Sequence, residues 1–519
     1  MSQDDAFSSY KSPLSSRYSS DYMKYLYSDR YKFQTWRKLW TILAKAQHDL
    51  GLSTVTLESV NLLKENINNI DFEQAKKEEK KLRHDVMAHV HTFKSCVEKV
   101  EKGNNSEAGG IIHLGATSCF VGDNTELIIH QKALRSLTDN LANVIHKLSI
   151  FADSYKKLPC LGFTHIQPAQ LTTVGKRATL WLQDFVIDFQ ELLHIQNTHL
   201  KFRSIKGATG TQATFLELFN NDHEKVDKLS KLVTKYAGFE KAGTFITTGQ
   251  TYPRKLDVLI LNCLANLAQS SYKMCQDIRL LASMKELEEP FESSQIGSSA
   301  MPYKRNPMRS ERVNALARHL MTLNSGMNQT AATQMFERTL DDSAYRRIAL
   351  AEGALTTDAI LKILNNICAG LVVYPKVITK HVNNELPFMV SENIMMHLVK
   401  NHNQNRQDVH EKLRVHSQKA GNQVKIEGGD NDLIERLLSD DYFAQFIDKK
   451  FIDEKIMNPS DYIGRSVELT DEFLQSEVRP LLQKYAADRK NPESSYLDEL
   501  VDEPLEPIFD LEKIEQLNI

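Results

Sequence analysis

The sequence predicts an all-α protein with a central bundle of long helices. Apolar residues recur at three- and four-residue steps through 127–151, 171–192 and 256–284, which is the spacing of one helix face. Few segments alternate between apolar and polar residues, as strands with one exposed face do. Because several long apolar seams occur without strands, a helical bundle is the expected core.

At 519 residues the chain is too long for a single simple core, so it should divide into domains. We expect an N-terminal helical domain over 1–117, the long-helix bundle over 118–372 and a C-terminal helical domain over 373–486. The remainder, 487–519, is rich in Asp and Glu and contains several prolines. Such a composition predicts an extended acidic tail.

Composition narrows the class of function. A formal net charge of −3 gives no overall reason to expect nucleic-acid or membrane binding, so any anion must be recognised by local clusters of cations. No apolar run is long enough to span a bilayer, and the N-terminus lacks the features of a secretory signal. The six cysteines are scattered without a Cys-x-x-Cys pair, which is typical of reduced thiols. We therefore expect a cytoplasmic protein.

The N-terminal region should begin with an irregular segment, in which Arg17 and Tyr18 read as part of a mobile tail on pattern alone. A helix is expected over 29–50, and Gly51 is suited to end it because glycine readily takes the left-handed conformation there. Another helix is expected over 57–67. Residues 73–83 are dense in Lys and Glu, which predicts a solvated face.

The triplet Arg83-His84-Asp85 follows this charged segment. His84 lies five residues before His89, and His91 lies two beyond that, so none of these spacings matches the i, i+4 pair of a helical zinc site. We expect no metal. A polar cluster fits better, with Asp85 orienting His84 and Arg83 gripping an anion.

Two polar segments flank the first bundle helix. Thr117 and Ser118 close an apolar run, and Ser118 or Asp123 could open the next helix as its cap. His165 lies in the segment 162–170, in a loop that we expect to end in a helix after Pro168. A histidine there suits proton transfer, although a capping role is an equal alternative on pattern alone.

Three later segments carry polar groups. Residues 203–213 combine glycines and hydroxyls without the order of a phosphate loop, and 249–254 form a polar turn. Residues 336–347 gather acids, hydroxyls and arginines. Either a ligand site or a salt-bridged helix surface explains this last set, and for Arg346 we expect the surface role.

The segment from Gly297 to Pro307 has no helical or strand periodicity, and its prolines predict a loop. A helix should follow, with Asn306 as cap and Pro307 in its first turn. Arg309 and Arg312 fall near its start, so this loop and helix should attract anions.

The loop Gly-Ser-Ser-x-Met-Pro-x-Lys-x-Asn-Pro resembles the signature of the fumarase/aspartase superfamily. Residues 164–170, Thr-His-x-Gln-Pro-Ala-Gln, and 111–118 resemble two further signatures of these lyases. Ala300, Tyr303 and Arg305, with Met-Arg-Ser-Glu-Arg at 308–312, are similar to the adenylosuccinate lyase family of the animal type. The resemblance covers roughly residues 10–485.

The resemblance implies a homotetramer with a central bundle of long helices, in which each site combines loops from three subunits. It implies two β-eliminations of fumarate in purine nucleotide biosynthesis. Adenylosuccinate gives AMP, and the succinyl-carboxamide ribotide (SAICAR) gives the carboxamide ribotide (AICAR). Both substrates are small molecules, and no cofactor is implied.

The resemblance also implies residue roles. His165 would protonate the leaving nitrogen and Ser298 would take the C–H proton, with its alkoxide stabilised by Lys304, helix amides and loop closure. Glu311 would polarise a histidine of the assembled site, and His84 would support catalysis. The expected substrate-binding residues are Arg17, Tyr18, Arg83, His84, Asp85, Thr117, Ser118, Gln250, Asn306, Arg312, Arg338, Ser343 and Arg347.

Two alternatives remain open at this point. Another lyase of the superfamily, such as one acting on argininosuccinate, would share the signatures, although Arg338, Ser343 and Arg347 favour a phosphorylated nucleotide. A non-catalytic helical scaffold could lose His165 and Ser298 freely, and both are present.

Overall fold

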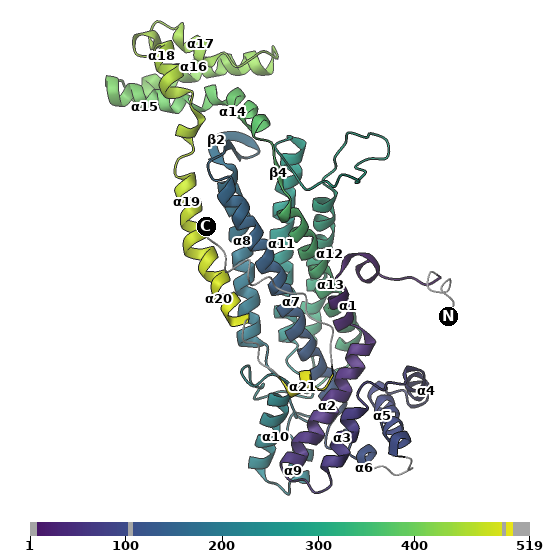
Figure 1. Cartoon of the computed structure of the whole chain (residues 1–519). Coiled ribbons are helices and arrows are strands. Elements are labelled where there is room, and N and C mark those ends of the chain that lie inside the picture. The colour runs from purple at the N-terminus through teal and green to yellow at the C-terminus, as the bar shows by residue number, and fades with distance from the viewer. Residues whose placement is uncertain (1–7, 102–106, 490–494, 502–519) are drawn as a thin grey trace.

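The computed structural model describes residues 8–101, 107–489 and 495–501. Long helices run side by side along an elongated molecule (Figure 1). The strands of the described residues form two short two-stranded antiparallel sheets, β1–β2 and β3–β4. The prediction of an all-α protein is confirmed.

The central bundle consists of α7 (Ser118–Ser154), α8 (Val174–His194), α11 (Lys255–Ser283), α12 (Met308–Ala332) and α13 (Asp342–Ala369). Helix α7 packs on α8 and α13, and α12 packs on α11 and α13. We call the two ends of the bundle the lower and the upper end, after their positions in Figure 1. The N-termini of α7, α11 and α13 gather at the lower end. The β1–β2 hairpin and the starts of α8 and α12 lie at the upper end.

The length of α7 separates these two ends. Its 37 residues span about 55 Å at 1.5 Å per residue. The apolar residues of its seam face inward, and Leu127, Leu137 and Leu148 are completely buried. Loops at the two ends of the bundle therefore cannot meet within one chain.

The first two N-terminal helices pack midway along α13, and the others pack at the lower end. Their bounds are η2 (Leu14–Tyr18), α1 (Asp21–Leu26), α2 (Asp29–Asp49), α3 (Leu57–Glu65), α4 (Phe72–Leu82), α5 (Asp85–Glu101) and α6 (Glu107–Gly110). The helices expected over 29–50 and 57–67 are confirmed, and Gly51 takes a φ of +78° directly after α2. Helix α4 is solvated except for Ala75, as its charge predicted.

The segment around His165 differs from the expectation. It forms a hairpin of β1 (Pro159–Thr164) and β2 (Gln167–Thr173), so the next helix begins at Val174 rather than after Pro168. Pro168 lacks an N–H, and the threonines that follow favour strand geometry. Thr173 then caps α8 by accepting a hydrogen bond from Lys176 N.

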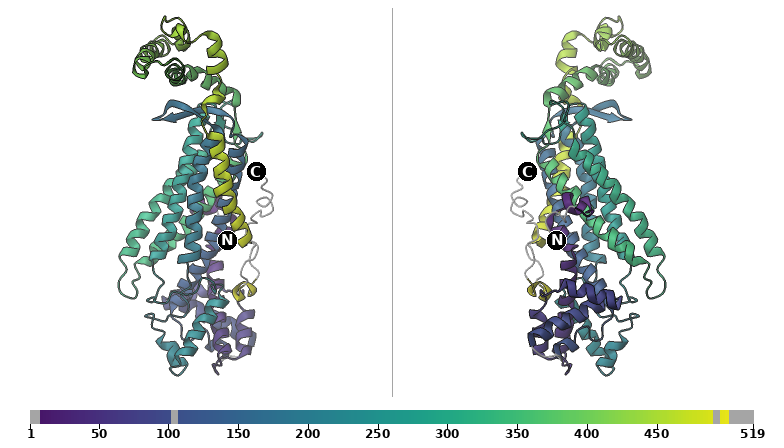
Figure 2. Two further views of the ribbon diagram at one scale, coloured as in Figure 1. Left: turned by 90° about the vertical axis from the view of Figure 1, so that its left-hand side faces the viewer. Right: turned by 90° about the vertical axis from the view of Figure 1, so that its right-hand side faces the viewer.

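Short elements connect the bundle helices and form the C-terminal part. They are η3 (Ile195–His199), α9 (Ala213–Leu218), α10 (His223–Tyr236), β3 (Leu287–Glu288), β4 (Val372–Val373), α14 (Pro375–Met389), α15 (Ser391–His402), α16 (Arg406–Lys425), α17 (Leu433–Leu438), η4 (Phe443–Gln445), α18 (Lys449–Phe451), η5 (Ile452–Ile456) and η6 (Pro459–Tyr462). Helices α14 to α18 lie beyond the upper end of the bundle (Figures 1 and 2).

The chain then returns along the bundle. Helix α19 (Ser466–Phe473), η7 (Leu474–Val478) and α20 (Arg479–Arg489) pack against α8 and α7, as the side views in Figure 2 show. Where an extended tail was expected, α21 (Tyr496–Glu499) forms a helical turn that packs on α2 and α10. Leu497, Leu500 and Val501 are buried there, so apolar contacts fix this part of the tail.

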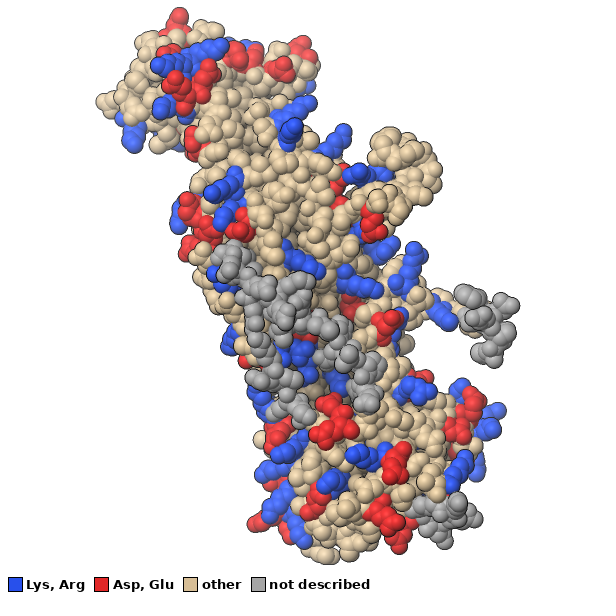
Figure 3. Space-filling view, in the orientation of Figure 1, with Lys and Arg blue, Asp and Glu red and all other residues tan. Residues whose placement is uncertain are grey.

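The surface carries charges of both signs. Acidic and basic side chains are interspersed on the face shown in Figure 3, without a broad basic field. Within the described residues, none of the helices combines the length and apolar character needed to cross a bilayer.

Candidate active site

The lower end gathers most of the residues that we expected to bind substrate. The turn between α4 and α5 carries the triplet 83–85, and Arg83 ends α4 with a φ of +56°. Arg347 Nη2 on α13 lies 3.4 Å from Asp85 Oδ2, which joins the triplet to the bundle. The side chains of Arg83, His84 and Arg347 are exposed. Polar groups distant in sequence therefore share one surface.

Asp85 does not orient His84 as we had expected. His84 Nδ1 lies 4.0 Å from Asp85 Oδ1, which is too long for a hydrogen bond. His84 Nδ1 instead accepts from Met87 N at 3.3 Å, and Asp85 Oδ1 accepts from Val86 N at 2.8 Å. Both side chains thus satisfy free amides at the start of α5.

Gln250 and Arg338 meet at the start of α7. Gln250 N donates to Glu337 O at 2.9 Å, and Gln250 Nε2 donates to Ala208 O at 3.1 Å. Cys119 lies between the two side chains, in contact with the Arg338 guanidinium and 3.7 Å from Gln250 Oε1. Burial raises the pKa of the Cys119 thiol to about 11, so it remains protonated.

Thr117 occupies the N-cap position of α7, but its side chain makes no cap hydrogen bond. The alternative in which Ser118 or Asp123 caps this helix is wrong, because α7 already begins at Ser118 and Asp123 is buried against Arg254. Thr117 and Ser118 are half-buried beside the Gln250 and Arg338 pair.

A buried ionic network lies directly behind these residues. Arg346 pairs with Asp257 at 2.7 Å and with Glu126 at 2.5 Å, so its expected place on a helix surface is wrong. Tyr252 OH donates to Asp257 Oδ1 at 2.6 Å. Although burial would raise the pKa of Asp257, Arg346 and His130 hold it well below its usual range. The sequence contained no local signal for this network, whose members are far apart in the chain.

A second group of polar residues lies between the two ends. The Arg312 guanidinium carbon is 5.4 Å from the centre of the Tyr18 ring, and that of Arg17 is 6.0 Å away. Leu14 is buried, and Ser20 caps α1 while contacting Asp358 of α13. Arg17 and Tyr18 are therefore part of an ordered turn, not of a mobile tail.

His165 occupies the tip of the β1–β2 hairpin at the upper end. His165 and Ile166 have φ values of +54° and +59°, which is the geometry of a tight two-residue hairpin turn. Both side chains are exposed. Gln170 Nε2 donates to Glu392 Oε2 at 3.2 Å, which links the hairpin to α15. The capping alternative for His165 is wrong, because Thr173 caps α8.

Ser298 lies in a loop that closes on itself at the same upper end. Ser298 Oγ accepts from Met301 N at 3.1 Å and from Ala300 N at 3.3 Å. Asn306 Nδ2 donates to Gly297 O at 2.8 Å and so closes the loop. A Cβ at Gly297 would lie 2.1 Å from Lys304 O, which explains the glycine.

Asn306 is not the cap of the following helix. The N-cap residue of α12 is Pro307, which has no side chain suited to capping. The Glu289 carboxylate accepts from Arg309 N and Ser310 N, both at 2.9 Å. The first free amides of α12 are thus satisfied by a buried carboxylate from the preceding segment.

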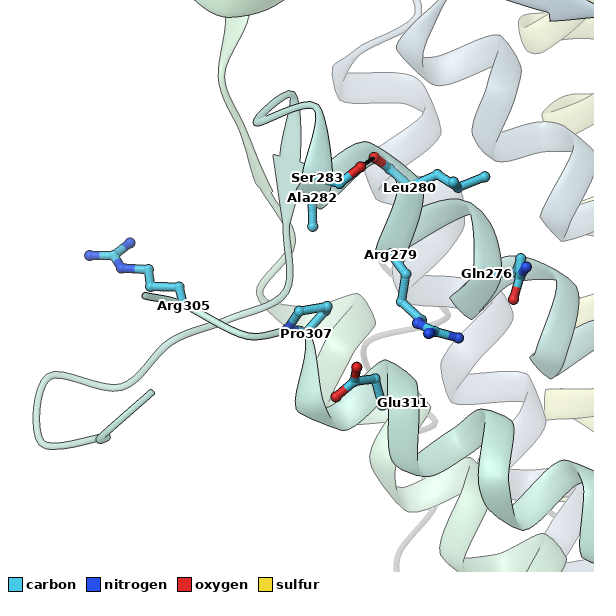
Figure 4. Close-up of a pocket in the computed structure, with 8 residues that line it drawn as sticks. All are labelled: Gln276, Arg279, Leu280, Ala282, Ser283, Arg305, Pro307 and Glu311. Atoms are coloured by element: carbon cyan, nitrogen blue, oxygen red, sulfur yellow. Dashed lines mark hydrogen bonds between the residues drawn. The ribbon is translucent and has the colours of Figure 1, made fainter. Parts of the chain in front are cut away.

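A pocket of about 370 Å³ opens at the base of the Ser298 loop (Figure 4). Arg279 from α11 and Glu311 from α12 point into the space between these helices, whereas Arg305 extends away. No histidine of the described chain lines this pocket. Lys304, which lies in the same loop as Ser298, is exposed.

His89, which follows the triplet, is packed among aromatic side chains of the N-terminal helices. His89 stacks on Phe33 with ring centres 3.7 Å apart, and burial beside Arg37 lowers its pKa to about 4. Among the described residues, no group of three or more His, Cys, Asp and Glu side chains is placed to hold a metal ion.

The structure thus brings most of the expected residues together in two sets at the ends of the bundle, with Arg17, Tyr18 and Arg312 between them. His165, Ser298, Lys304 and Glu311 lie at the upper end, whereas Thr117, Ser118, Gln250, Arg338 and Ser343 lie at the lower end. Long helices run between the two ends, and α11, which leads from the Gln250 turn toward the Ser298 loop, has 29 residues and spans about 44 Å. One chain therefore contains two half-sites rather than a complete one.

Comparisons with known proteins agree over nearly the whole chain. The model of a family described as "Lyase" matches residues 16–322, and that of "Adenylosuccinate lyase C-terminus" matches residues 387–473. The adenylosuccinate lyase of Saccharomyces cerevisiae is 50% identical over 482 residues, covering 92% of this chain and 97% of its own. That of Schizosaccharomyces pombe is 49% identical over 481 residues, with the same coverage.

Solved structures show the same fold at low identity. The 3-carboxy-cis,cis-muconate lactonizing enzyme of Pseudomonas putida superposes with a TM-score of 0.77 at 19% identity, over 90% of this chain and 99% of its own. A fumarate lyase from Mesorhizobium sp. BNC1 gives a TM-score of 0.74 at 19% identity, over 90% of this chain and 100% of its own.

Proposed function

The chain belongs to the adenylosuccinate lyase family of the fumarase/aspartase superfamily, and from this we propose how its two half-sites carry out the reaction. The protein is a C–N lyase that eliminates fumarate from adenylosuccinate to give AMP, a step of purine nucleotide biosynthesis. We assign the elimination of fumarate from SAICAR, giving AICAR, to the same site. The observation that carries this assignment is the identity of about half the residues over nearly the full chain.

The reaction makes separable demands on the protein. A base must remove a C–H proton beside a carboxylate, and an acid must protonate the departing nitrogen. Cations must hold the substrate's carboxylates and phosphate as charge develops. The residues of the two half-sites match these demands in kind, because one set supplies acid and base and the other supplies mainly cations and hydroxyls.

Ser298 is the base in this scheme. A serine hydroxyl is a poor base unless its alkoxide is stabilised, and Ser298 Oγ already accepts two backbone hydrogen bonds, from Ala300 N and Met301 N. Amide donors aimed at an oxygen stabilise negative charge on it, as in an oxyanion hole. These donors come from the loop itself rather than from the helix amides that we had expected. Lys304, in the same loop, adds a positive charge on closure.

His165 is the acid in this scheme, because an imidazole can donate a proton and the exposed hairpin tip can reach into a neighbouring copy. Glu311 faces Arg279 in its own chain, so a histidine that it polarises comes from another copy. His84 supports catalysis from the lower end. Five arginines hold the anions of the substrate, namely Arg17, Arg83, Arg312, Arg338 and Arg347. The other residues that bind the substrate are Tyr18, Asp85, Thr117, Ser118, Gln250, Asn306 and Ser343.

A homotetramer with sites shared between subunits completes the scheme. Leu180 and Ile187 lie seven residues apart on α8 and are half-exposed, as is Leu280 on α11. Apolar side chains in such positions on bundle helices favour a second layer of helices. Antiparallel association would bring the upper end of one copy to the lower end of another. The free, buried cysteines support a reducing compartment, and we assign the protein to the cytoplasm.

A spectrophotometric assay of fumarate release tests the function. Adenylosuccinate, SAICAR and argininosuccinate are supplied separately to the purified protein. Turnover of both purine substrates without turnover of argininosuccinate is the expected result. Turnover of argininosuccinate alone would assign the protein to a different lyase of the superfamily, and no turnover of any of them would favour the scaffold alternative.

A further inference from the structure

Arg254 lies at the point where the lower half-site is joined to the bundle. It is the N-cap residue of α11, and its guanidinium is almost completely buried. Arg254 Nε donates to Asp342 Oδ2 at 2.7 Å. Its two terminal nitrogens donate to the two oxygens of Asp123, at 3.1 and 3.2 Å. One planar side chain therefore holds two carboxylates in a fixed geometry.

We call Arg254, Asp123 and Asp342 the bridge. Its three members come from three of the segments that carry the lower half-site. Asp123 lies in the second turn of α7, just after Thr117 and Ser118. Asp342 is the first residue of α13 and directly precedes Ser343. Arg254 itself lies four residues after Gln250, in the same polar turn. These three segments are thus tied together by charged groups that lie within a few residues of their expected substrate contacts.

The carboxylates of the bridge have few hydrogen-bond partners besides Arg254. Asp342 Oδ1 is buried without a hydrogen-bond partner among the described residues, so the carboxylate depends on Arg254. Asp123 Oδ2 also accepts from Tyr252 N at 2.7 Å, and the Tyr252 ring lies 4.6 Å from the guanidinium carbon. The Tyr252 ring and the two carboxylates together restrict the position of the guanidinium.

We propose that Arg254 is a positioning residue for substrate binding, which fixes the N-termini of α7 and α13 relative to the 249–254 turn. This inference rests on the proposed function, because it concerns how the same half-site presents Gln250, Arg338 and Ser343. Arg254 does not touch the substrate. It acts through the placement of side chains whose own contacts depend on where their helices begin.

The bridge predicts a particular kinetic signature. His165 and Ser298 lie at the opposite end of the bundle, so a displaced lower half-site weakens binding without removing the acid or the base. KM should rise while kcat changes little. A purely structural ion pair would instead lower the melting temperature and leave KM unchanged in the folded enzyme.

The test compares Asp123→Asn, Asp342→Asn and the double variant in the intact enzyme with adenylosuccinate. Each single variant is expected to raise KM by about 10-fold, with kcat within about 3-fold of wild type. The KM of the double variant should be about the same as that of the single variant with the higher KM, because both changes act through one guanidinium. Binding of AMP, measured by calorimetry, should weaken in parallel.

Asp139→Asn is the matched control. Asp139 forms a comparable ion pair with Arg489, at 2.7 Å, but lies farther along α7 and away from the substrate segments. This variant should lose thermal stability and keep the wild-type KM. If Asp342→Asn does not fold, Asp342→Glu keeps the charge while lengthening the side chain, and its KM should still rise.

Folded bridge variants with wild-type KM and AMP affinity would overturn the inference, as would a fall in kcat at unchanged KM. A wild-type enzyme without activity on either purine substrate would contradict the proposed function instead. The two failures are therefore distinguishable.

Discussion

At the scale of single residues, Ser298 is the group whose chemistry depends most on its surroundings. The two loop amides that donate to its Oγ arise from the local turn, not from distant elements. Ser298→Ala removes the base, and kcat should fall by about 10²–10⁴-fold or more at an unchanged melting temperature. His165→Ala should fall in the same range. Ser299→Ala, which alters the exposed neighbouring hydroxyl, is the control, and wild-type turnover by either test variant would remove that residue from its role.

Arg338 is expected to act on binding rather than on chemistry. Its guanidinium lies beside Gln250 and the start of α7, far from His165. Arg338→Ala should raise KM by about 10-fold or more with a smaller effect on kcat, as measured by steady-state kinetics. Arg414→Ala, on the surface of α16, should leave both constants unchanged. An unaltered KM in Arg338→Ala would argue against direct contact with the substrate.

His113 makes stability depend on pH. Trp40 Nε1 donates to His113 Nδ1 at 2.9 Å, so this nitrogen must stay unprotonated, and burial lowers the pKa of His113 to about 4. Because the unfolded chain binds the proton near pH 6.5, the stability conferred by neutral His113 is complete above that pH and is lost as the pH falls toward 4.

His113→Asn tests this effect. Asn retains an acceptor for Trp40 and tolerates the φ of +68° at this position, but it does not titrate. Between pH 7 and pH 5, the wild type should lose about 2 kcal/mol more unfolding free energy than the variant. Equal losses in urea titrations of the two proteins would contradict the assignment.

At the scale of elements, helical seams were predictable because their apolar period extends over many turns. The β1–β2 hairpin was not predicted, since Leu171 and Val174 continue the three-residue steps of the α8 seam backwards into β2. The strand arises from pairing with β1, a contact that the period of one segment cannot reveal.

The junction of this hairpin with α8 depends on Gly175. A Cβ at this position would lie 2.1 Å from Ala152 O and 2.6 Å from Lys156 N, at the end of α7. Because backbone must move to admit it, Gly175→Ala should destabilise the protein by about 2 kcal/mol or more, measured by chemical denaturation.

Gly421, in α16, has nothing within 4 Å of an added Cβ, so Gly421→Ala should stabilise α16 by about 0.5–1 kcal/mol. If both substitutions had the same effect, close packing at Gly175 would not be its cause.

At the scale of the whole molecule, the sequence predicted the class of fold, and its resemblance to a family named the residues of the site. It did not reveal that Arg254, Arg346 and Cys119 stand behind those residues, since their partners lie up to about 220 positions away in the chain. Nor did local patterns show that the residues fall at opposite ends of the bundle. That division follows from the order and length of the helices, and it makes shared sites the central claim.

Mixing two inactive variants tests that claim most directly. His165→Gln damages the upper half-site and Arg338→Glu the lower one, and each protein alone should be nearly inactive. After subunit exchange at equal concentrations, about a quarter of the sites would combine two intact halves from different copies, so about a quarter of wild-type activity should return. If differently tagged subunits co-purify as mixed oligomers and the mixture stays as inactive as its parents, His165 and Arg338 do not meet between copies and the account is wrong.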